Sequence, residues 1–380
     1  MKILLYTPTV PVEAGGVQAV FNRLALGLHD LGHEVKRVWP IPYYKSPEPY
    51  LDDYFPHLDE WPGVRSIGSA KETLRLFRRL IGGLRRNRPD VVNVHFVRPG
   101  VRYFLWLRRW FGFKLVLTFH GSDALWPAEN EAPYLTRLVA QADAVTAVSP
   151  MVAERLRELV GEANTPVHVI PNGIDYPFWS KADTQADRDL QRPVILAVGR
   201  LVPVKNHQLL IEAMAGIRQR CPAARLVILG SGECEADLRQ QIASHDLEDV
   251  VEMPGEADPE TVREWLGRAS VYVLPSRSEG MPLSLLEAMA AGVPSVATEV
   301  GGVPILAEGG AARLVPDNDP DAMASAIEIL MKESSSRDEV TTQGRLRARQ
   351  YTLESMVGAY EEVLSGVLGN LETKGASDAI

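Results

Sequence analysis

Hydrophobic and polar residues follow two patterns that alternate along the chain. Short apolar runs, such as Lys114–Phe119 and Val194–Val198, are typical of strands buried on both faces of a sheet. Between these runs lie longer segments, such as Gly16–Leu31, whose apolar residues recur at helical spacing. Strands that alternate with helices predict parallel sheets covered by helices.

The first half of the chain contains one such series, which ends at the turn Pro171–Asp175. Its predicted strands are Lys2–Thr7, Glu34–Trp39, Val64–Ile67, Asp90–Phe96, Lys114–Phe119, Ala144–Val148 and Val167–Ile170. Its predicted helices are Gly16–Leu31, Ala70–Arg86, Val101–Trp110, Pro133–Gln141 and Pro150–Val160. A loop rich in proline and tyrosine, Ile41–Pro62, interrupts the series and is long enough to be a functional excursion.

The pattern restarts after a polar linker, Tyr176–Arg192, which lacks strong periodicity. The predicted strands are now Val194–Val198, Arg225–Leu229, Val250–Met253, Val271–Leu274 and Val293–Ala297, and the helices are Gln208–Gln219, Ala236–Ser244 and Pro259–Leu266. A helical tail covers Met323–Gly369, and Leu371–Ile380 is expected to fray. Two such series predict two doubly wound domains, residues 1–175 and 176–352, that bind ligands at the carboxyl ends of their strands.

Composition indicates a soluble globular protein. Of the 380 residues, 46% are hydrophobic and 23% are charged. No run reaches the roughly 18 apolar residues of a membrane span, and the N-terminus leads directly into an apolar strand. The only cysteines are Cys221 and Cys234, which fits a reducing compartment, so a cytoplasmic protein is expected.

Charge is divided unevenly between the halves. Residues 1–175 carry 21 Lys and Arg against 18 Asp and Glu, whereas the remainder carries 19 against 31. From Arg65 to Lys114 there are 13 basic residues and only two acidic ones, with Leu, Phe and Trp between them. Such a segment suits an anionic membrane, a lipid-linked phosphate or nucleic acid. The acidic second half argues against nucleic acid, and a solvated helix face is the alternative.

Candidate chemistry is densest between Ser276 and Gly292, which read as a strand end, a turn and a helix. Amide groups at the start of a helix bind anions. Glu279 and Glu287 are eight residues apart, roughly two helical turns, so both carboxylates can lie beside one polar ligand. The plain alternative is a helix cap at Glu279 and a solvated face at Glu287.

Other strand ends carry similar residues. Arg200 and Lys205 lie in one loop and can neutralise a diphosphate. Gly230–Glu233 permits a close approach of the backbone to a flat ring but lacks the third glycine of the NAD fingerprint, and Gly15–Gly16 is a similar turn. His120 ends an apolar strand, which favours a functional role. Each of these turns, taken alone, is also compatible with an ordinary connection.

Two Asp-x-Asp strings are candidate metal ligands. Asp187–Asp189 lies in the linker, and Asp317–Asp319 lies in a turn just before a helix. Because aspartate commonly caps helices, capping is favoured for the second string, and no metal is expected.

The order of these motifs resembles the retaining glycosyltransferases of family 4. The resemblance covers roughly Met1 to Leu368 and is strongest from Val194 to Val315. It rests on Gly15-Gly16-Val17, Gly32-His33-Glu34-Val35, His120-Gly121, Pro171-Asn172-Gly173-Ile174-Asp175, Gly199-Arg200 with Lys205-Asn206, Gly230-Ser231-Gly232-Glu233, and the pair Glu279 and Glu287. The family implies the α/β fold called GT-B, in which two doubly wound Rossmann-like domains face each other across a cleft. A C-terminal helix, here about residues 353–370, would return to the first domain.

The resemblance also implies roles for individual residues. Arg200 and Lys205 would hold the donor diphosphate, and Glu287 would hold the ribose hydroxyls. Glu279 would contact the transferred sugar, and His120 would lie beside the sugar ring; Arg200, Lys205, Glu279 and His120 would be the catalytic residues. The other implied contacts are Gly15, Gly16, Gly230, Gly232, Gly280, Met281, Pro282 and Leu283 on the donor side, and Val17, Asp123 and Asn172 on the acceptor side.

The implied activity is sugar transfer, with retention of configuration and without a metal or other cofactor, from a nucleoside-diphosphate sugar to a glycan or lipid-linked acceptor. UDP is favoured over GDP because UDP is common in the family, and cell-surface polysaccharide or glycolipid synthesis is the expected process. The segment Arg65–Lys114 would contact an anionic membrane at its inner face, and no nucleic acid partner is expected. Ile305 departs from the family pattern, which commonly has glutamate at this position.

Other activities share this fold. A sugar-nucleotide epimerase would need no acceptor, and a nucleotide-sugar binder would need no catalysis. A phosphorylase is disfavoured, because no lysine lies in a recognisable pyridoxal phosphate context.

Overall fold

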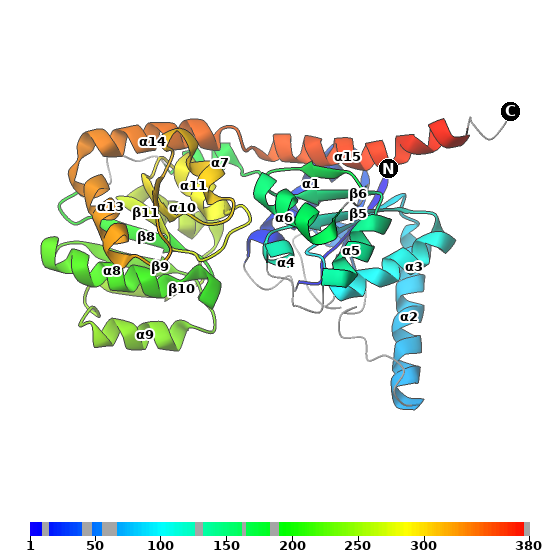
Figure 1. Cartoon of the computed structure of the whole chain (residues 1–380), viewed down its shortest axis with the longest axis horizontal. Coiled ribbons are helices and arrows are strands. Elements are labelled where there is room, and N and C mark those ends of the chain that lie inside the picture. The colour runs from blue at the N-terminus through cyan, green and yellow to red at the C-terminus, as the bar shows by residue number, and fades with distance from the viewer. Residues whose placement is uncertain are drawn as a thin grey trace. The chain divides into compact units, whose positions relative to one another are not determined.

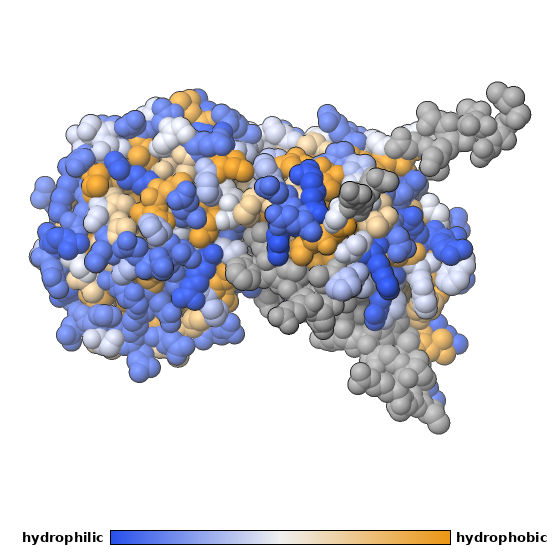
Figure 2. All heavy atoms as spheres, in the orientation of Figure 1, coloured by the Kyte–Doolittle hydropathy of each residue, from blue (hydrophilic) through white to orange (hydrophobic). Residues whose placement is uncertain are grey.

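The structure is a computed structural model that describes residues 1–9, 15–39, 48–54, 67–125, 132–161, 165–182 and 190–375. The chain forms two compact units (Figure 1). Unit 1 consists of Met1–Asn172 and Leu353–Ile380, and unit 2 consists of Gly173–Thr352. On the face of unit 2 that Figure 2 shows, most residues are hydrophilic and hydrophobic residues are scattered among them.

Unit 1 is built on a parallel sheet of seven strands in the order β3-β2-β1-β4-β5-β6-β7. The strands are β1 (Lys2–Tyr6), β2 (Glu34–Trp39), β3 (Asp52–Tyr54), β4 (Val91–His95), β5 (Lys114–Phe119), β6 (Ala144–Ala147) and β7 (Val167–Val169). The helices are α1 (Gly16–Asp30), α2 (Ile67–Asn87), α3 (Arg102–Phe111), α4 (Ser122–Leu125), α5 (Ala132–Gln141), α6 (Pro150–Val160) and α15 (Leu353–Gly375), with 3-10 turns η1 (Pro49–Leu51) and η2 (Pro99–Val101).

Unit 2 is built on a parallel sheet of six strands in the order β10-β9-β8-β11-β12-β13. The strands are β8 (Val194–Val198), β9 (Arg225–Leu229), β10 (Val251–Gly255), β11 (Val271–Leu274), β12 (Ser295–Thr298) and β13 (Arg313–Val315). The helices are α7 (Tyr176–Ser180), α8 (His207–Arg220), α9 (Glu235–Ser244), α10 (Pro259–Arg268), α11 (Leu283–Ala290), α12 (Val303–Ala307), α13 (Pro320–Lys332) and α14 (Ser334–Ala348), with 3-10 turns η4 (Pro203–Lys205) and η5 (Glu308–Gly310).

Both sheets reverse their strand order at one place, between β1 and β4 in unit 1 and between β8 and β11 in unit 2. Ligands of doubly wound sheets bind at the carboxyl ends of the strands beside such a switch point. Two doubly wound parallel sheets confirm the predicted fold class. In unit 1, α1 packs against α15, and α5 packs against α3 and α6 (Figure 1). Right-handed crossovers put these two groups of helices on opposite faces of the sheet.

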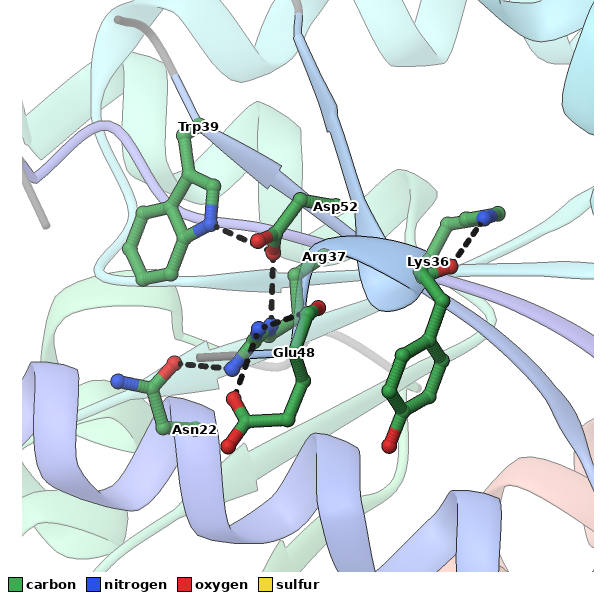
Figure 3. Close-up of polar contacts among 7 residues, drawn as sticks. Asn22, Lys36, Arg37, Trp39, Glu48 and Asp52 are labelled. Atoms are coloured by element: carbon green, nitrogen blue, oxygen red, sulfur yellow. Dashed lines mark hydrogen bonds and ion pairs between the residues drawn. The ribbon is translucent and has the colours of Figure 1, made fainter. Parts of the chain in front are cut away.

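The prediction of an uninterrupted loop over residues 41–62 is wrong, because β3 forms within it and pairs with β2. The strand is held by Arg37, whose side chain is 2% exposed. Arg37 Nε donates to Asp52 Oδ1 at 2.8 Å, and Trp39 Nε1 donates to the same oxygen at 3.0 Å (Figure 3). Asn22 of α1 accepts from the other side of the guanidinium at 2.9 Å. Polar contacts to a neighbouring strand, and not an apolar run, therefore place β3.

Three other predictions need correction. Of the predicted strand over residues 64–67, Ile67 begins α2, and residues 64–66 lie outside the described residues. The predicted linker over residues 176–192 begins with α7, because Asp175 caps it by accepting from Phe178 N at 2.9 Å and Trp179 is buried. The tail predicted to fray from Leu371 continues as helix to Gly375, and residues 376–380 are not described.

Candidate active site

Two loops meet at the switch point of unit 2. The loop after β8 carries Arg200, which is exposed, and Lys205, which ends the turn η4. The loop after β11 covers residues 275–282 and leads into α11. The main-chain N–H of Arg277 donates to the carbonyl of Val204 at 2.8 Å, so the second loop is tied to the first.

Glu279 is the centre of this arrangement. Lys205 Nζ lies 2.6 Å from Glu279 Oε1, and Ser276 Oγ donates to the same oxygen at 2.6 Å. The Glu279 side chain is buried, so the ion pair is shielded from solvent. The alternative in which Glu279 caps a helix is wrong, because α11 begins at Leu283 and its N-cap is Pro282.

The main chain of Glu279 is held by the turn before α12. Gly302 N donates to the carbonyl oxygen of Glu279 at 3.0 Å. Gly301 has φ +58°, and a Cβ atom there would lie 1.9 Å from that oxygen. Only glycine fits at Gly301, because its backbone is left-handed and lies against Glu279.

The two predicted carboxylates both act on one buried hydroxyl group. Tyr272 of β11 donates to Ser284 Oγ at 2.7 Å. Burial raises the pKa of Tyr272, and the negative charges of Glu279 and Glu287 raise it further. The hydrogen bond to Ser284 opposes this shift, and the charges of both carboxylates favour the neutral phenol.

The glycines of the loop after β9 have an internal packing role. A Cβ at Gly230 would lie 2.0 Å from the carbonyl oxygen of Gly199, and one at Gly232 would lie 2.4 Å from that of Leu201. Leu201 N also donates to Ser231 O at 2.8 Å. Close packing of the two loops therefore requires glycine at both positions, in addition to the ligand contact that the sequence predicts.

In unit 1, His120 follows β5 and is held through its ring and its main chain. His120 Nε2 lies 3.0 Å from Nδ1 of His95. Burial lowers the pKa of His120 to about 3, and burial together with His120 holds the pKa of His95 well below its ordinary value. The rings of His95 and His120 are therefore both neutral near pH 7. The main chain is held by Asp123, whose Oδ1 accepts from the N–H of His120 at 2.9 Å and from that of Gly121 at 3.0 Å.

Asp123, predicted on the acceptor side, also joins two loops. Its Oδ2 accepts from Val97 N, after β4, at 3.0 Å. Burial raises the pKa of Asp123 to about 6, although the donated hydrogen bonds oppose this shift. Asp123 therefore positions the main chain around His120.

The remaining predicted residues of unit 1 lie at element ends. Gly15 precedes α1, and a Cβ there would lie 2.5 Å from Gln18 Oε1. Gly16 begins α1, where a Cβ would meet none of the described atoms within 4 Å, and Val17 follows. Asn172 is buried and is the last residue of the first segment of unit 1.

Sequence reasoning missed four buried polar residues. Asn93 and His95 are both fully buried in β4, where they stand two positions apart in an otherwise apolar strand. That spacing was the available signal, since alternate residues share one face of a strand. Ser276 and His207 lie beside Glu279 and Lys205; burial and the charge of Lys205 lower the pKa of His207 to about 4.

The candidate metal ligands have other roles where they are described. Asp319 caps α13 by accepting from Ala322 N at 2.8 Å, which confirms the predicted cap. Asp187–Asp189 lies outside the described residues. Within the described ranges, no group of three or more His, Cys, Asp or Glu residues could hold a metal. Glu308, the acid nearest to Ile305 in the sequence, pairs with Arg347 at 2.7 Å, and its side chain is 62% exposed.

The described cations of the basic segment, residues 65–114, lie in different surroundings. Several of its cations form ion pairs, Arg86 with Asp53 and both Arg108 and Lys114 with Asp143. The exposed face of α3 is different: Trp106 is 65% exposed and Trp110 is 72% exposed, and both Arg102 and Arg109 are exposed within the same 100° of the helix. Arg65 is not among the described residues, and none of the described helices is long and apolar enough to cross a membrane.

Both units match known families. Residues 14–176 match Glycosyltransferase Family 4, and residues 180–347 match Glycosyl transferases group 1. These two matches together account for most of the chain's length and support a group 1 glycosyltransferase. This confirms the predicted resemblance at the level of the group.

Relatives and solved structures agree with that family. The amylovoran biosynthesis glycosyltransferase AmsK of Erwinia amylovora is 32% identical over 238 residues, which are 60% of this chain and 56% of the relative. N-acetyl-alpha-D-glucosaminyl L-malate synthase of Bacillus anthracis is 27% identical over 97% of this chain and 98% of its own. The chain spans 54–60% of the length of its relatives AmsK and WcaL.

Two solved structures share the fold. Sucrose-phosphate synthase of Thermosynechococcus elongatus superimposes with a TM-score of 0.81 at 21% identity, over 97% of this chain and all of that one. HepE of Anabaena, in complex with UDP and glucose, superimposes with a TM-score of 0.77 at 19% identity, over 96% of this chain and all of its own. At these identities the likeness establishes the GT-B fold alone.

Proposed function

We propose that the protein is a retaining, metal-independent glycosyltransferase. It would transfer a sugar from a nucleoside-diphosphate sugar, with UDP favoured, to a hydroxyl of a glycan or lipid-linked acceptor in polysaccharide biosynthesis. The bond from the anomeric carbon to the diphosphate breaks, and the acceptor oxygen bonds to the same face of that carbon. The acceptor proton passes to the departing phosphate oxygen. The name of AmsK supports the process, and the UDP bound to HepE supports the nucleotide.

The cluster of Lys205, Glu279 and Ser276 at the switch point of unit 2 carries this proposal. A departing diphosphate needs fixed cations, because charge develops on it as the bond breaks. An ammonium group has three donors, so Lys205 can donate to a phosphate oxygen while it donates to Glu279. Arg200 lies exposed in the same loop and can add two parallel hydrogen bonds.

The other residues complete the proposed donor contacts. Main-chain N–H groups of Leu283, Ser284 and Leu285, in the first turn of α11, have no acceptor within the helix and would bind phosphate oxygens. The turn over residues 280–283 would contact the phosphates and the sugar. Glu287 would accept from the ribose hydroxyls. Glu279 and His120 would contact the transferred sugar.

Single substitutions separate these roles. Lys205→Ala should lower kcat at least tenfold, because a charge-assisted contact contributes about 1.5–3 kcal/mol. Glu279→Ala should abolish transfer and leave nucleotide affinity nearly unchanged, whereas Glu287→Ala should weaken nucleotide binding. Thermal shifts with UDP, GDP and ADP measure the affinity, since a ligand at 100 times its Kd adds roughly 2.7 kcal/mol to the stability of the native state.

A matched control is Glu308→Ala, which breaks the ion pair with Arg347 in the same unit and should leave kcat unchanged. Wild-type turnover in Lys205→Ala would contradict the diphosphate assignment. Incubation with the donor alone tests for epimerase activity, which this fold also supports. A rearranged sugar nucleotide formed without an acceptor would indicate an epimerase.

The proposal includes contact with the inner face of an anionic membrane through α3. Tryptophan prefers the interface between lipid and water, and arginine is attracted to anionic head groups. Trp106 and Trp110 are exposed on the same face as Arg102 and Arg109, which combines both preferences on one helix. This face would hold the enzyme beside a lipid-linked acceptor.

Liposome co-sedimentation tests this contact. We expect the protein to bind vesicles that contain anionic lipid more strongly than zwitterionic vesicles, and Trp106→Ser with Trp110→Ser to reduce that binding at least tenfold. Leu346→Ala is the control, because Leu346 is 50% exposed on unit 2 and should not matter. Equal binding to both kinds of vesicle would count against the membrane contact.

A further inference from the structure

A series of buried polar groups leads from the core of unit 1 to His120. It begins at the main-chain carbonyl oxygen of Val116, which can only accept a hydrogen bond. Asn93 Nδ2 lies 3.3 Å from this oxygen and 2.8 Å from Thr118 Oγ1. The amide nitrogen of Asn93 therefore faces the carbonyl, and its Oδ1 faces His95 at 2.8 Å from Nε2.

This order of atoms assigns a hydrogen to each ring. Because Asn93 Oδ1 can only accept, His95 Nε2 carries a hydrogen. His95 is neutral, since burial and the neighbouring ring hold its pKa well below its ordinary value, so its Nδ1 has a lone pair. His120 Nε2 lies 3.0 Å from that Nδ1 and must donate to it. A neutral His120 then has its lone pair on Nδ1.

We propose that His95 is a positioning residue, which fixes His120 as the neutral tautomer with hydrogen on Nε2, so that the His120 ring meets the substrate as a hydrogen-bond acceptor. This inference rests on the proposed function, in which His120 lies beside the transferred sugar. A sugar hydroxyl can donate to a lone pair, whereas an ionised diphosphate oxygen cannot. The tautomer therefore selects a hydroxyl group as the partner of the ring.

The main chain and the ring of His120 are fixed together. Asp123 accepts from the His120 N–H at 2.9 Å, while the ring donates to His95. His95 itself is enclosed by aromatic rings, edge-on to Phe21 at 5.4 Å and stacked on Tyr360 at 5.9 Å between centroids. These neighbours leave His95 little freedom to turn, so the assignment of its two nitrogens persists.

Histidine labelled with nitrogen-15 in the full-length protein tests the tautomer without any substrate. Long-range proton–nitrogen correlation spectra distinguish a ring nitrogen that carries hydrogen from one with a lone pair. Signals of the two residues are assigned from His95→Gln and His120→Ala spectra. We expect hydrogen on Nε2 alone in both rings near pH 7. Hydrogen on Nδ1 of His120, or on both its nitrogens, would overturn the proposal. A protein that has this tautomer but no transferase activity would refute the proposed function only.

Activity then separates positioning from a purely structural role. His95→Phe keeps an aromatic ring but removes the acceptor for His120, so His120 should show mixed tautomers. We expect kcat to fall about tenfold, the effect of one ordinary hydrogen bond, while KM for the donor changes less than about twofold. His95→Gln, whose side-chain oxygen can accept, should recover most of kcat.

Thr146→Val is the matched control. Thr146 Oγ1 lies 2.7 Å from Thr118 Oγ1, so it belongs to the same buried network but not to the path from Val116 to His120. We expect this variant to lose stability without a change in the His120 tautomer or in kcat. Equal losses of kcat in Thr146→Val and His95→Phe would overturn the positioning role, and the spectrum of the wild-type protein decides the tautomer even if a variant fails to fold.

Discussion

Among single residues, Asp123 combines deep burial with a negative charge. Its side chain is 5% exposed, and burial raises its pKa from 3.8 to about 6. In the unfolded chain this carboxyl binds its proton only near the lower value. Between these two pH values the folded protein binds a proton that the unfolded chain does not, so stability from this group is lost as the pH rises through about 6.

Comparison of the wild type with Asp123→Asn isolates this effect, because the amide does not titrate. We expect the wild type to gain about 2 kcal/mol of unfolding free energy relative to the variant when the pH falls from 7 to about 4.5. Urea denaturation at both pH values, with hydrogen exchange of peptides from unit 1 as the readout, measures this difference in unfolding free energy. A difference that stays constant or shrinks toward low pH would contradict the raised pKa.

At the same scale, the candidate site was predictable as a set of residues but not as a set of contacts. Glu279 and Lys205 each follow an apolar strand, and parallel strands bring their carboxyl ends to one edge of the sheet. Their direct ion pair joins residues 74 positions apart, and a local sequence pattern cannot predict a contact over such a separation. The pair between His95 and His120 was missed for the same reason, since it joins two adjacent strands.

Among elements, strands with continuous apolar runs were predictable, whereas β3 was not. β5 and β8 have the predicted bounds because most of their residues are buried on both faces of a sheet. β3 has three residues, two of which are aspartates, and it depends on a hydrogen bond to Arg37, 15 positions away. Local hydrophobicity cannot predict an element that long-range polar contacts hold in place.

Substitution of the two aspartates of β3 tests this account. Asp52→Ala removes the nearest charge from Arg37, which is 1% exposed, so we expect a loss of about 3 kcal/mol of unfolding free energy. Asp53→Ala is the neighbouring control: its ionic partner Arg86 has a side chain 62% exposed, and Asn87, which also donates to Asp53, is uncharged. We expect a smaller loss of about 1 kcal/mol. Urea denaturation of both variants gives the comparison. Similar losses would mean that β3 does not depend on the buried charge of Arg37.

For the molecule as a whole, the two units differ in how the chain builds them. Unit 2 is one continuous segment, whereas unit 1 takes α15 from the far end of the chain. α15 lies against α1, where a Cβ at Gly27 would come within 2.4 Å of Val357, so the two helices are in close contact. The helical periodicity of residues 323–369 predicted helices there, but periodicity alone does not say which sheet a helix covers.

Removal of residues 353–380 should therefore unfold one unit and spare the other. The buried side chains that α15 contributes are Met356, Val357, Tyr360, Leu364 and Val367. At about 1.5–3 kcal/mol for each, their combined burial is comparable to the roughly 5–15 kcal/mol that stabilises a typical domain. We expect hydrogen exchange to show loss of protection throughout unit 1 and retained protection in unit 2.

A chain that ends after residue 370 keeps all five side chains and should resemble the wild type, because it preserves the contact between α15 and α1. Equal loss of protection in both units would show that unit 2 needs unit 1 in order to fold, since α15 belongs to unit 1.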